Sequence, residues 1–249
     1  MSNVQSSMLV KTRAVVLHTL KYGERKVIVE LLCRDTGRTA CIVAVPKTQK
    51  GRVQMQMLQP MTLLDVEIDV RPTALLQHLR DVRMSSPFST IPFMPEKLSI
   101  VLFIAEFLYH ATRGEQHNEA LFDYVENSIQ WLDGCADSFA NFHLVFMMRL
   151  ARFIGFYPNV DEYQQGDFFD LRDAMFVDRA PSHPDYLSSA DAERLHQLVR
   201  MDYNTMRLFR MSHDDRNRIT DGIIRYYRLH VDGFPELRAF AVLKELWKS

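Results

Sequence analysis

The sequence has 249 residues, of which 47% are apolar and 24% charged, so it is long enough for one large globular domain or two modest ones. Its 30 Lys and Arg residues oppose 31 Asp and Glu residues, and the net charge of −1 excludes a strongly basic or acidic protein. No apolar run reaches the roughly 18 residues of a membrane-spanning helix. Three cysteines form no disulfide framework or metal motif, which fits a reducing compartment. We therefore expect a soluble cytoplasmic protein with no membrane partner.

The first 85 residues follow a β pattern. Residues 14–17 predict a buried strand, and further strands are expected over residues 27–33, 38–45 and 61–70. The turn Asp35-Thr36-Gly37 predicts a hairpin, because Gly adopts positive φ readily. Residues 75–84 fit either a fifth strand or a helix. Four or five short strands in about 75 residues indicate a small barrel, and the OB-fold has this strand count.

A proline-rich stretch follows the β pattern. Residues 87–95 contain three of the ten prolines, so they continue neither a strand nor a helix. We therefore expect a linker over residues 86–95. It would separate a barrel domain, residues 1–85, from a helical domain, residues 96–249.

Beyond this linker the apolar residues recur at helical spacing. Helices are predicted over residues 96–110, 118–132, 139–154, 188–199, 212–231 and 236–247. The residues expected to cap four of them are Asn118, Ser138, Ser188 and Ser212. The predicted fold class is α+β with two domains, a small β-barrel (OB-fold) followed by an all-α domain.

Signatures of catalysis are missing from the sequence. It contains no phosphate loop, no GxGxxG, no GxSxG and no HExxH, so we expect no enzyme, catalytic residue or cofactor. His143 lies in an apolar helix and is expected to be a hydrogen-bonded core or interface residue. The acidic stretch Asp161–Asp178 is favoured as a solvated loop between helices. The alternative is a metal-dependent nuclease that uses the carboxylates of Asp161–Asp173.

Positive charge is concentrated near the N-terminus. Residues 1–85 hold 13 Lys and Arg against 7 Asp and Glu, a net charge of +6, which leaves −7 for residues 86–249. This asymmetry suggests a polyanion-binding half. Loops at one rim of a barrel can converge on a groove, and eight cations are candidates for it: Lys21, Arg25, Lys26, Arg34, Arg38, Lys47, Lys50 and Arg52. Because Tyr22 is the only aromatic residue in this half, contacts with phosphate are expected rather than base stacking.

Two of these expectations have open alternatives. The loop with Lys47, Lys50 and Arg52 would also fit a solvated surface connector. In the helical half, Arg149 and Arg152 beside Phe153 would form a cationic rim around an apolar pocket that suits a short acidic, aromatic peptide. A simple pair of surface arginines is the alternative there.

Five motifs carry a family resemblance when taken in order. They are YGERKVIV at residues 22–29, TGR at 36–38, QPxTLLxxE at 59–67, which follows the basic loop, and two C-terminal motifs, RFIGFYPN at 152–159 and YYRLHVDGFPELRAFAVLKEL at 226–246. Together they resemble the RecO family of bacterial recombinational repair proteins over nearly the whole chain.

This resemblance implies an N-terminal OB-fold, a helical domain, and a mediator that is cytoplasmic and nucleoid-associated. It implies binding of single- and double-stranded DNA and annealing of complementary strands. Contacts with RecR and with the acidic C-terminal tail of single-strand DNA-binding protein, and help in loading RecA, are also implied. An RNA-binding OB adaptor is a further alternative.

Many family members carry a four-cysteine zinc site after the motif at residues 152–159. The corresponding residues 160–187 contain no cysteine. We therefore expect no metal site there, and acidic and aromatic residues in its place.

Overall fold

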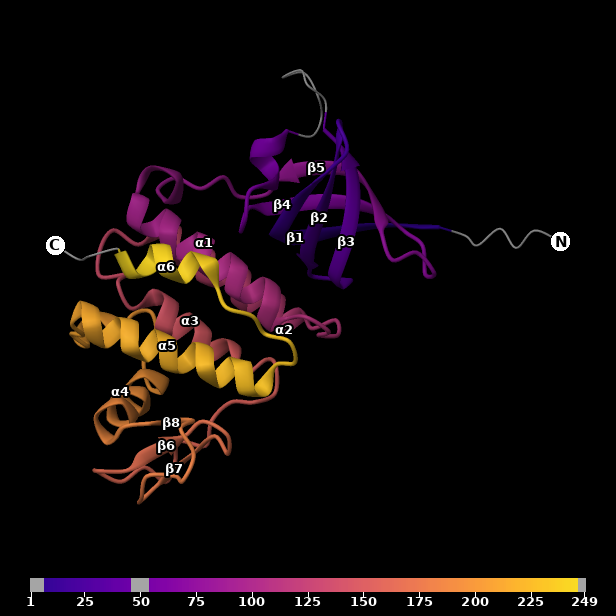
Figure 1. The fold of residues 1–249 in the computed structure, drawn as a ribbon. Helices are drawn as coiled ribbons and strands as arrows, with labels where there is room; N and C mark the ends of the chain where they lie inside the picture. The colour runs from indigo at the N-terminus through magenta and orange to yellow at the C-terminus, as the bar shows by residue number, and fades with distance from the viewer. Residues whose placement is uncertain (1–6, 46–53, 246–249) are drawn as a thin grey trace. The chain divides into compact units, whose positions relative to one another are not determined.

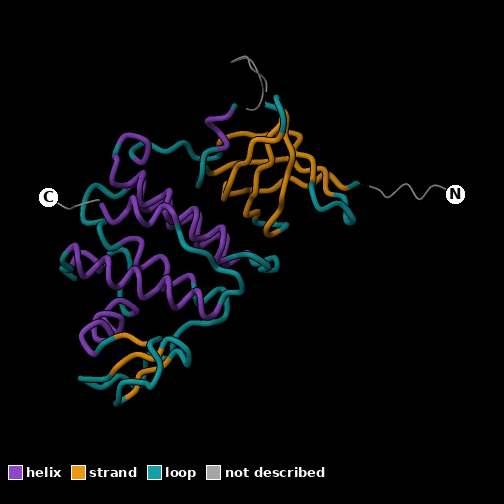
Figure 2. Tube along the Cα trace, viewed as in Figure 1, coloured by secondary structure: helices purple, strands orange, loops and turns teal. Residues whose placement is uncertain are grey.

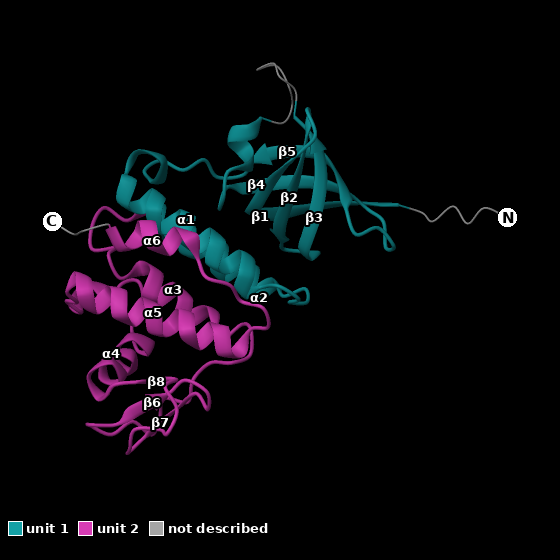
Figure 3. Cartoon of the chain, in the orientation of Figure 1, with its two compact units in different colours: residues 1–133 teal, residues 134–249 magenta. Residues whose placement is uncertain are grey.

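A computed structural model of the chain describes residues 7–45 and 54–245 (Figure 1). Contacts within the chain form two compact units, unit 1 over residues 1–133 and unit 2 over residues 134–249 (Figure 3). The change from strands to helices lies earlier than the division between the units, because the last barrel strand ends at Met84 and the first long helix begins at Pro95. The domain division expected at the prolines stays a prediction.

Five strands of unit 1 form a closed barrel in the order β1-β2-β3-β5-β4. Figures 1 and 2 show these strands gathered in the N-terminal part of the chain. Their bounds are β1 Met8–Tyr22, β2 Lys26–Cys33, β3 Gly37–Ala44, β4 Leu63–Val70 and β5 Gln77–Met84. The first half of β1 pairs with β4 and its second half with β2. A short parallel pairing of β3 with β5, at Cys41 and Gln77, completes the closure. This OB-like barrel, followed by helices, confirms the predicted fold class.

β-Bulges explain why the sequence of residues 75–84 fits either a strand or a helix. Residues 75–84 looked partly helical because the buried side chains Leu79 and Val82 are three positions apart. The structure makes them a strand, in which the pairing register shifts between Glu67 and Ile68 of β4 and so changes the alternation in β5. A second irregularity in β1, between Val16 and His18, accompanies its uninterrupted run of buried residues.

Two helices complete the described part of unit 1. They are α1, Pro95–Ala111, and α2, Glu119–Gly134, and two short 3-10 turns, η1 Met55–Leu58 and η2 Ile91–Phe93, precede them. Asn118 caps α2 as predicted, since the N–H of Leu121 donates to its Oδ1 (3.0 Å). Within unit 1, α1 packs against β1.

The segment before α1 is bound to the end of α2. Lys97 is fully buried, and its Nζ donates to Thr90 Oγ1 (2.7 Å) and to the carbonyl of Asp133 (3.1 Å). Although burial raises the pKa of Asp133, the backbone N–H groups of Ser89, Ile91 and Thr90 together lower it to about 2. This network fixes the proline-rich segment as part of unit 1.

Unit 2 contains four helices and a small sheet among its described residues. The elements are α3 Phe142–Leu150, β6 Phe168–Asp170, β7 Met175–Val177, β8 Tyr186–Leu187, α4 Ser189–Val199, η3 Met206–Leu208, α5 His213–His230 and α6 Arg238–Glu245. The sheet has the order β7-β6-β8, so the expectation of a plain loop over the acidic stretch is wrong. Phe169, Leu171 and Phe176 are buried there and give the sheet an apolar side. No helix in the described ranges is long and apolar enough to cross a membrane.

The predicted start of the third helix is also wrong. Ser138 does not cap it: its φ is 60°, and α3 begins only after Asn141. The helix ends at Leu150, and turns lead from there to Gly155, whose φ is 86°.

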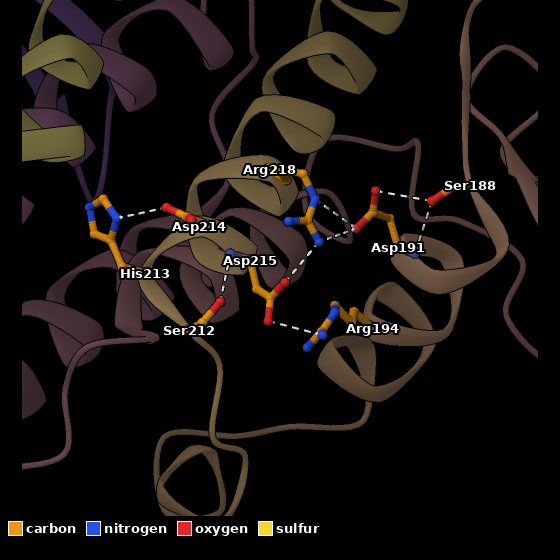
Figure 4. Close-up of polar contacts among 8 residues, drawn as sticks. All are labelled: Ser188, Asp191, Arg194, Ser212, His213, Asp214, Asp215 and Arg218. Carbon is orange, nitrogen blue, oxygen red and sulfur yellow. Dashed lines mark hydrogen bonds and ion pairs between the residues drawn. The ribbon is translucent and has the colours of Figure 1, made fainter. Parts of the chain in front are cut away.

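Serine caps begin α4 and α5, as predicted (Figure 4). The hydroxyl of Ser188 accepts the N–H of Asp191 (3.4 Å), and that of Ser212 accepts the N–H of Asp215 (3.1 Å). Each cap therefore places a carboxylate in the first turn, where the helix dipole favours negative charge.

Two arginines join these carboxylates. Arg218 Nη2 lies 3.2 Å from Asp191 Oδ1 and 2.7 Å from Asp215 Oδ1, and Arg194 pairs with the other oxygen of Asp215 at 2.9 Å (Figure 4). This network ties the first turn of α4 to that of α5 and has a structural role.

Candidate nucleic-acid interface

The barrel cations divide into two groups by their partners. Of the ten Lys and Arg residues that the structure describes between residues 7 and 85, seven have a carboxylate oxygen within 4 Å: Lys11, Arg13, Arg34, Arg38, Arg71, Arg80 and Arg83. The other three, Lys21, Arg25 and Lys26, have none among the described residues, and all three are exposed. We call these three the hairpin cations, because they lie at the turn between β1 and β2.

The turn between β1 and β2 is tight and open to solvent. Tyr22 pairs with Lys26 across it, and Gly23 has a φ of 74°, a backbone conformation that suits glycine. Tyr22 is 55% exposed. Glu24, also exposed, is the one acidic residue in the turn. The hairpin thus presents three cations, one carboxylate and an accessible aromatic ring.

Both described ends of the predicted basic loop are bound to this hairpin. The N–H of Val45 donates to the carbonyl of Arg25 (2.8 Å), and Thr19 Oγ1 donates to the carbonyl of Leu58 (2.8 Å). The three cations of that loop, Lys47, Lys50 and Arg52, lie outside the described residues, and their contact with DNA stays a prediction.

Arg34 and Arg38 do not converge with the hairpin cations. They flank the turn at the other end of β2, and eight residues of strand place that turn roughly 23 Å from Lys26. Both side chains are engaged within unit 1. Arg34 lies 2.9 Å from Glu119 and 3.1 Å from Asp123, and Arg38 donates to the carbonyl of Tyr109 (2.6 Å). Arg34 and Arg38 therefore lie at the opposite end of β2 from the hairpin cations, and one groove for all eight cations stays a prediction.

One face of α2 supplies the opposing charge. Glu119, Asp123 and Glu126 recur at helical spacing and point to the same side. Glu126 is buried and pairs with Arg13 at 2.5 Å, and the bond to Asp123 raises the pKa of Arg34. These three carboxylates are visible in the sequence, but they lie beyond residue 85 and are therefore not included in the net charge of +6 of residues 1–85.

In unit 2, Arg149 and Arg152 are held at neighbouring points. Arg149 donates from Nε (3.2 Å) and Nη2 (3.0 Å) to the carbonyl of Met201. Arg152 donates to the hydroxyl of Tyr157 (2.8 Å), and its guanidinium lies 4.3 Å from the centre of that ring. Phe153 is partly buried. Docking of an acidic peptide by these three residues stays a prediction.

Asp170 has a structural role within the acidic stretch. Its carboxylate accepts the backbone N–H groups of Arg172 (2.8 Å) and Asp173 (3.2 Å), and its other oxygen lies 3.1 Å from His183 Nε2. These bonds hold the turn between β6 and β7. Within the ranges described, no three His, Cys, Asp or Glu residues are arranged to hold a metal ion.

Comparison with known proteins identifies the family. The model described as "Recombination protein O N terminal" matches residues 8–88, and "Recombination protein O C terminal" matches residues 93–238. The chain belongs to the RecO family. Among its relatives, proteins named "DNA repair protein RecO" are 47% identical in Bacteroides fragilis, over 241 residues, and 46% in Phocaeicola vulgatus, over 240 residues. The Porphyromonas gingivalis protein of that name is 30% identical over 249 residues.

Each of these alignments covers 96% of this chain and the whole of the relative. The resemblance inferred from the five motifs is thereby confirmed. Membership of the RecO family gives the chain a role in DNA repair and recombination.

Proposed function

We propose that this RecO family member is a mediator that binds single- and double-stranded DNA and anneals complementary strands. With RecR, it would help load RecA onto strands coated by single-strand DNA-binding protein, without a catalytic step of its own. The observation that carries this proposal is the pattern of ion pairing among the barrel cations. Among the described ones, only the hairpin cations lack a carboxylate partner, and all three share one exposed turn.

The mechanism follows from charge neutralisation. A Lys or Arg that contacts phosphate displaces a condensed counterion, and the logarithm of the binding constant falls by about 0.7 per contact for each tenfold rise in salt on single strands. Three contacts therefore account for a slope of about −2 and for about 100-fold in affinity at about 0.1 M salt. The bound cations screen the repulsion between two strands. Base pairing then determines which strands anneal.

Replacing the hairpin cations tests the proposal. In the full chain, K21Q/R25Q/K26Q should bind an oligonucleotide of about 16 thymidines about 100-fold more weakly than the wild type at about 0.1 M salt. Its salt slope should be shallower by about 2, as measured by fluorescence anisotropy. The matched control is K11Q/R71Q/R83Q, which removes three exposed barrel cations that are already ion-paired.

The control should bind within about twofold of the wild type, since its cations are neutralised before DNA arrives. Equal salt slopes for the wild type and the hairpin variant would contradict the proposal. Preferential binding of an RNA of the same length would favour the RNA adaptor instead. Cleavage of the DNA in the presence of Mg²⁺ that D161N abolishes would indicate the nuclease.

A further inference from the structure

Unit 2 contains its own group of cations without carboxylate partners. Six of its arginines have a carboxylate oxygen within 4 Å: Arg172, Arg179, Arg194, Arg218, Arg225 and Arg228. Five others have none among the described residues and form what we call the arginine surface: Arg149, Arg152, Arg200, Arg207 and Arg210. All of the five except Arg149 are exposed.

The arginine surface follows one segment along α3. Residues 199–210 are bound to the C-terminal end of that helix by Arg149, which donates to the carbonyl of Met201. At the N-terminal end, Asn141 Nδ2 donates to the carbonyl of Phe209 (2.9 Å). A helix of nine residues is about 13 Å long, so the cations are spread over at least this distance.

The segment carries little opposing charge. Asp202 is the only acidic residue between positions 199 and 210. Its carboxylate accepts the N–H groups of Asn204 (2.9 Å) and Thr205 (2.7 Å), and the backbone N–H of Thr205 makes the largest contribution to lowering its pKa. This carboxylate stabilises the turn and lies within 4 Å of none of the five guanidinium groups, although the charge of Arg149 also helps to lower its pKa.

Three of the five side chains are already oriented. Arg207 donates from Nε to the carbonyl of Asn204 (3.3 Å). Arg149 is fixed by two hydrogen bonds to one carbonyl, and Arg152 lies over the ring of Tyr157. A guanidinium has five N–H donors, so each retains donors for a second acceptor. Guanidinium groups match the geometry of phosphate, and fixing them in advance reduces the entropy lost on binding.

We propose that the arginine surface is a second phosphate-binding site, which takes the backbone of one DNA strand while the hairpin cations hold another. This inference rests on the proposed annealing function and assigns part of it to unit 2. DNA is favoured over an acidic peptide because the cations are distributed along a segment that runs from one end of α3 to the other. One open cavity among the described residues of unit 2 lies at β8, α4, α5 and α6, and none of the five arginines lines it.

The test uses R200Q/R207Q/R210Q in the full chain, since these three exposed side chains have no ion pair to lose. The matched control is R172Q/R179Q/R228Q, which removes the same charge from the same unit. Two probes are used: a single labelled thymidine oligonucleotide, and a pair of complementary strands labelled for energy transfer. A peptide of alternating Asp and Phe residues serves as the acidic competitor.

The variant should bind the single oligonucleotide within about threefold of the wild type, because the hairpin cations remain. It should anneal the complementary strands at least tenfold more slowly, whereas the control anneals at the wild-type rate. Equal annealing rates for variant and control would overturn the inference. So would loss of peptide binding with unchanged annealing, which would assign the surface to an acidic protein partner.

These outcomes are separate from failure of the proposed function. If K21Q/R25Q/K26Q binds and anneals DNA like the wild type, then the hairpin is not the first site and the proposed function fails. If the hairpin variant is defective and R200Q/R207Q/R210Q is not, then only the second site is wrong.

Discussion

His143 is a polar residue enclosed in an apolar helix, and the expectation of a hydrogen-bonded core residue is confirmed. It is 2% exposed, and its Nε2 lies 3.1 Å from Thr220 Oγ1. Thr220 donates its own proton to the carbonyl of Arg216 (2.7 Å), so the imidazole is the donor of the first bond. Burial, and next the charge of Arg216, lower the pKa of His143 to about 3.

The consequence is a loss of stability in mild acid. The unfolded chain binds a proton at this residue below about pH 6.5, whereas the folded chain does so only near pH 3, so stability falls as the pH drops between these values. From pH 6.5 to pH 5 the residue should contribute a loss of about 2 kcal/mol. Urea unfolding of the wild type and of H143Q at both pH values would measure it. An equal loss in the variant would show that other groups are responsible.

At the scale of elements, the pairing of α2 with the barrel rests on charge as well as apolar contact. Arg13 lies between two carboxylates of the helix, Glu126 and Asp123, and its guanidinium is 5.5 Å from the ring of Phe122. Burial raises the pKa of Glu126, and the nearby Arg13 opposes that rise. Arg13, a residue from another element, thus favours the ionised form of this carboxylate.

Replacing Arg13 alone should therefore destabilise the chain more than replacing Arg13 and Glu126 together. We expect R13Q to destabilise the chain by about 2 kcal/mol at pH 7, because it leaves a buried carboxylate without its cation. The Arg13 side chain is 44% exposed, so solvent screens its ion pairs and limits the loss of stability. The double variant R13Q/E126Q should recover at least half of the loss in urea unfolding. Additive effects of R13Q and E126Q would show that the two residues do not interact.

The sequence predicted those elements that depend on local signals. Gly37 has a φ of 68°, as the hairpin turn required, and Ser188 and Ser212 cap the helices they were expected to begin. The strands β6, β7 and β8 were missed because two or three residues are too short to show alternation. Ser138 failed as a cap because its φ of 60° differs from the extended conformation of an N-cap residue.

For the whole molecule, the charge distribution looks different once the packing is known. The first 85 residues have a net charge of +6, but the first 133 residues hold 15 Lys and Arg against 14 Asp and Glu. The acidic face of α2 cancels Arg13 and Arg34, so the net positive charge of the sequence is not all available to a ligand. The periodicity of a sequence predicts helices and strands, whereas ion pairs between residues far apart in the sequence become known only from the fold. The cations of the candidate site were therefore predictable from the sequence, but their carboxylate partners were not.

Freeing Arg34 tests whether it belongs to the DNA site. In E119Q/D123N both of its carboxylate partners become neutral, and the net charge rises by two. Since Arg34 lies roughly 23 Å from the hairpin and salt screens charges beyond about 8 Å, the salt slope for single strands should stay within about 0.3 of the wild type. The control D178N/D214N makes the same change of net charge at two exposed carboxylates.

Thermal unfolding would establish that both variants are folded before their affinities are compared. A slope steeper by about 0.7 in E119Q/D123N, but not in the control, would mean that the freed Arg34 gains a phosphate contact. In that case DNA would run along β2 from one turn to the other, and α2 would compete with it for the same cations. An unchanged slope confines the first DNA site to the end of the barrel that carries Lys21, Arg25 and Lys26.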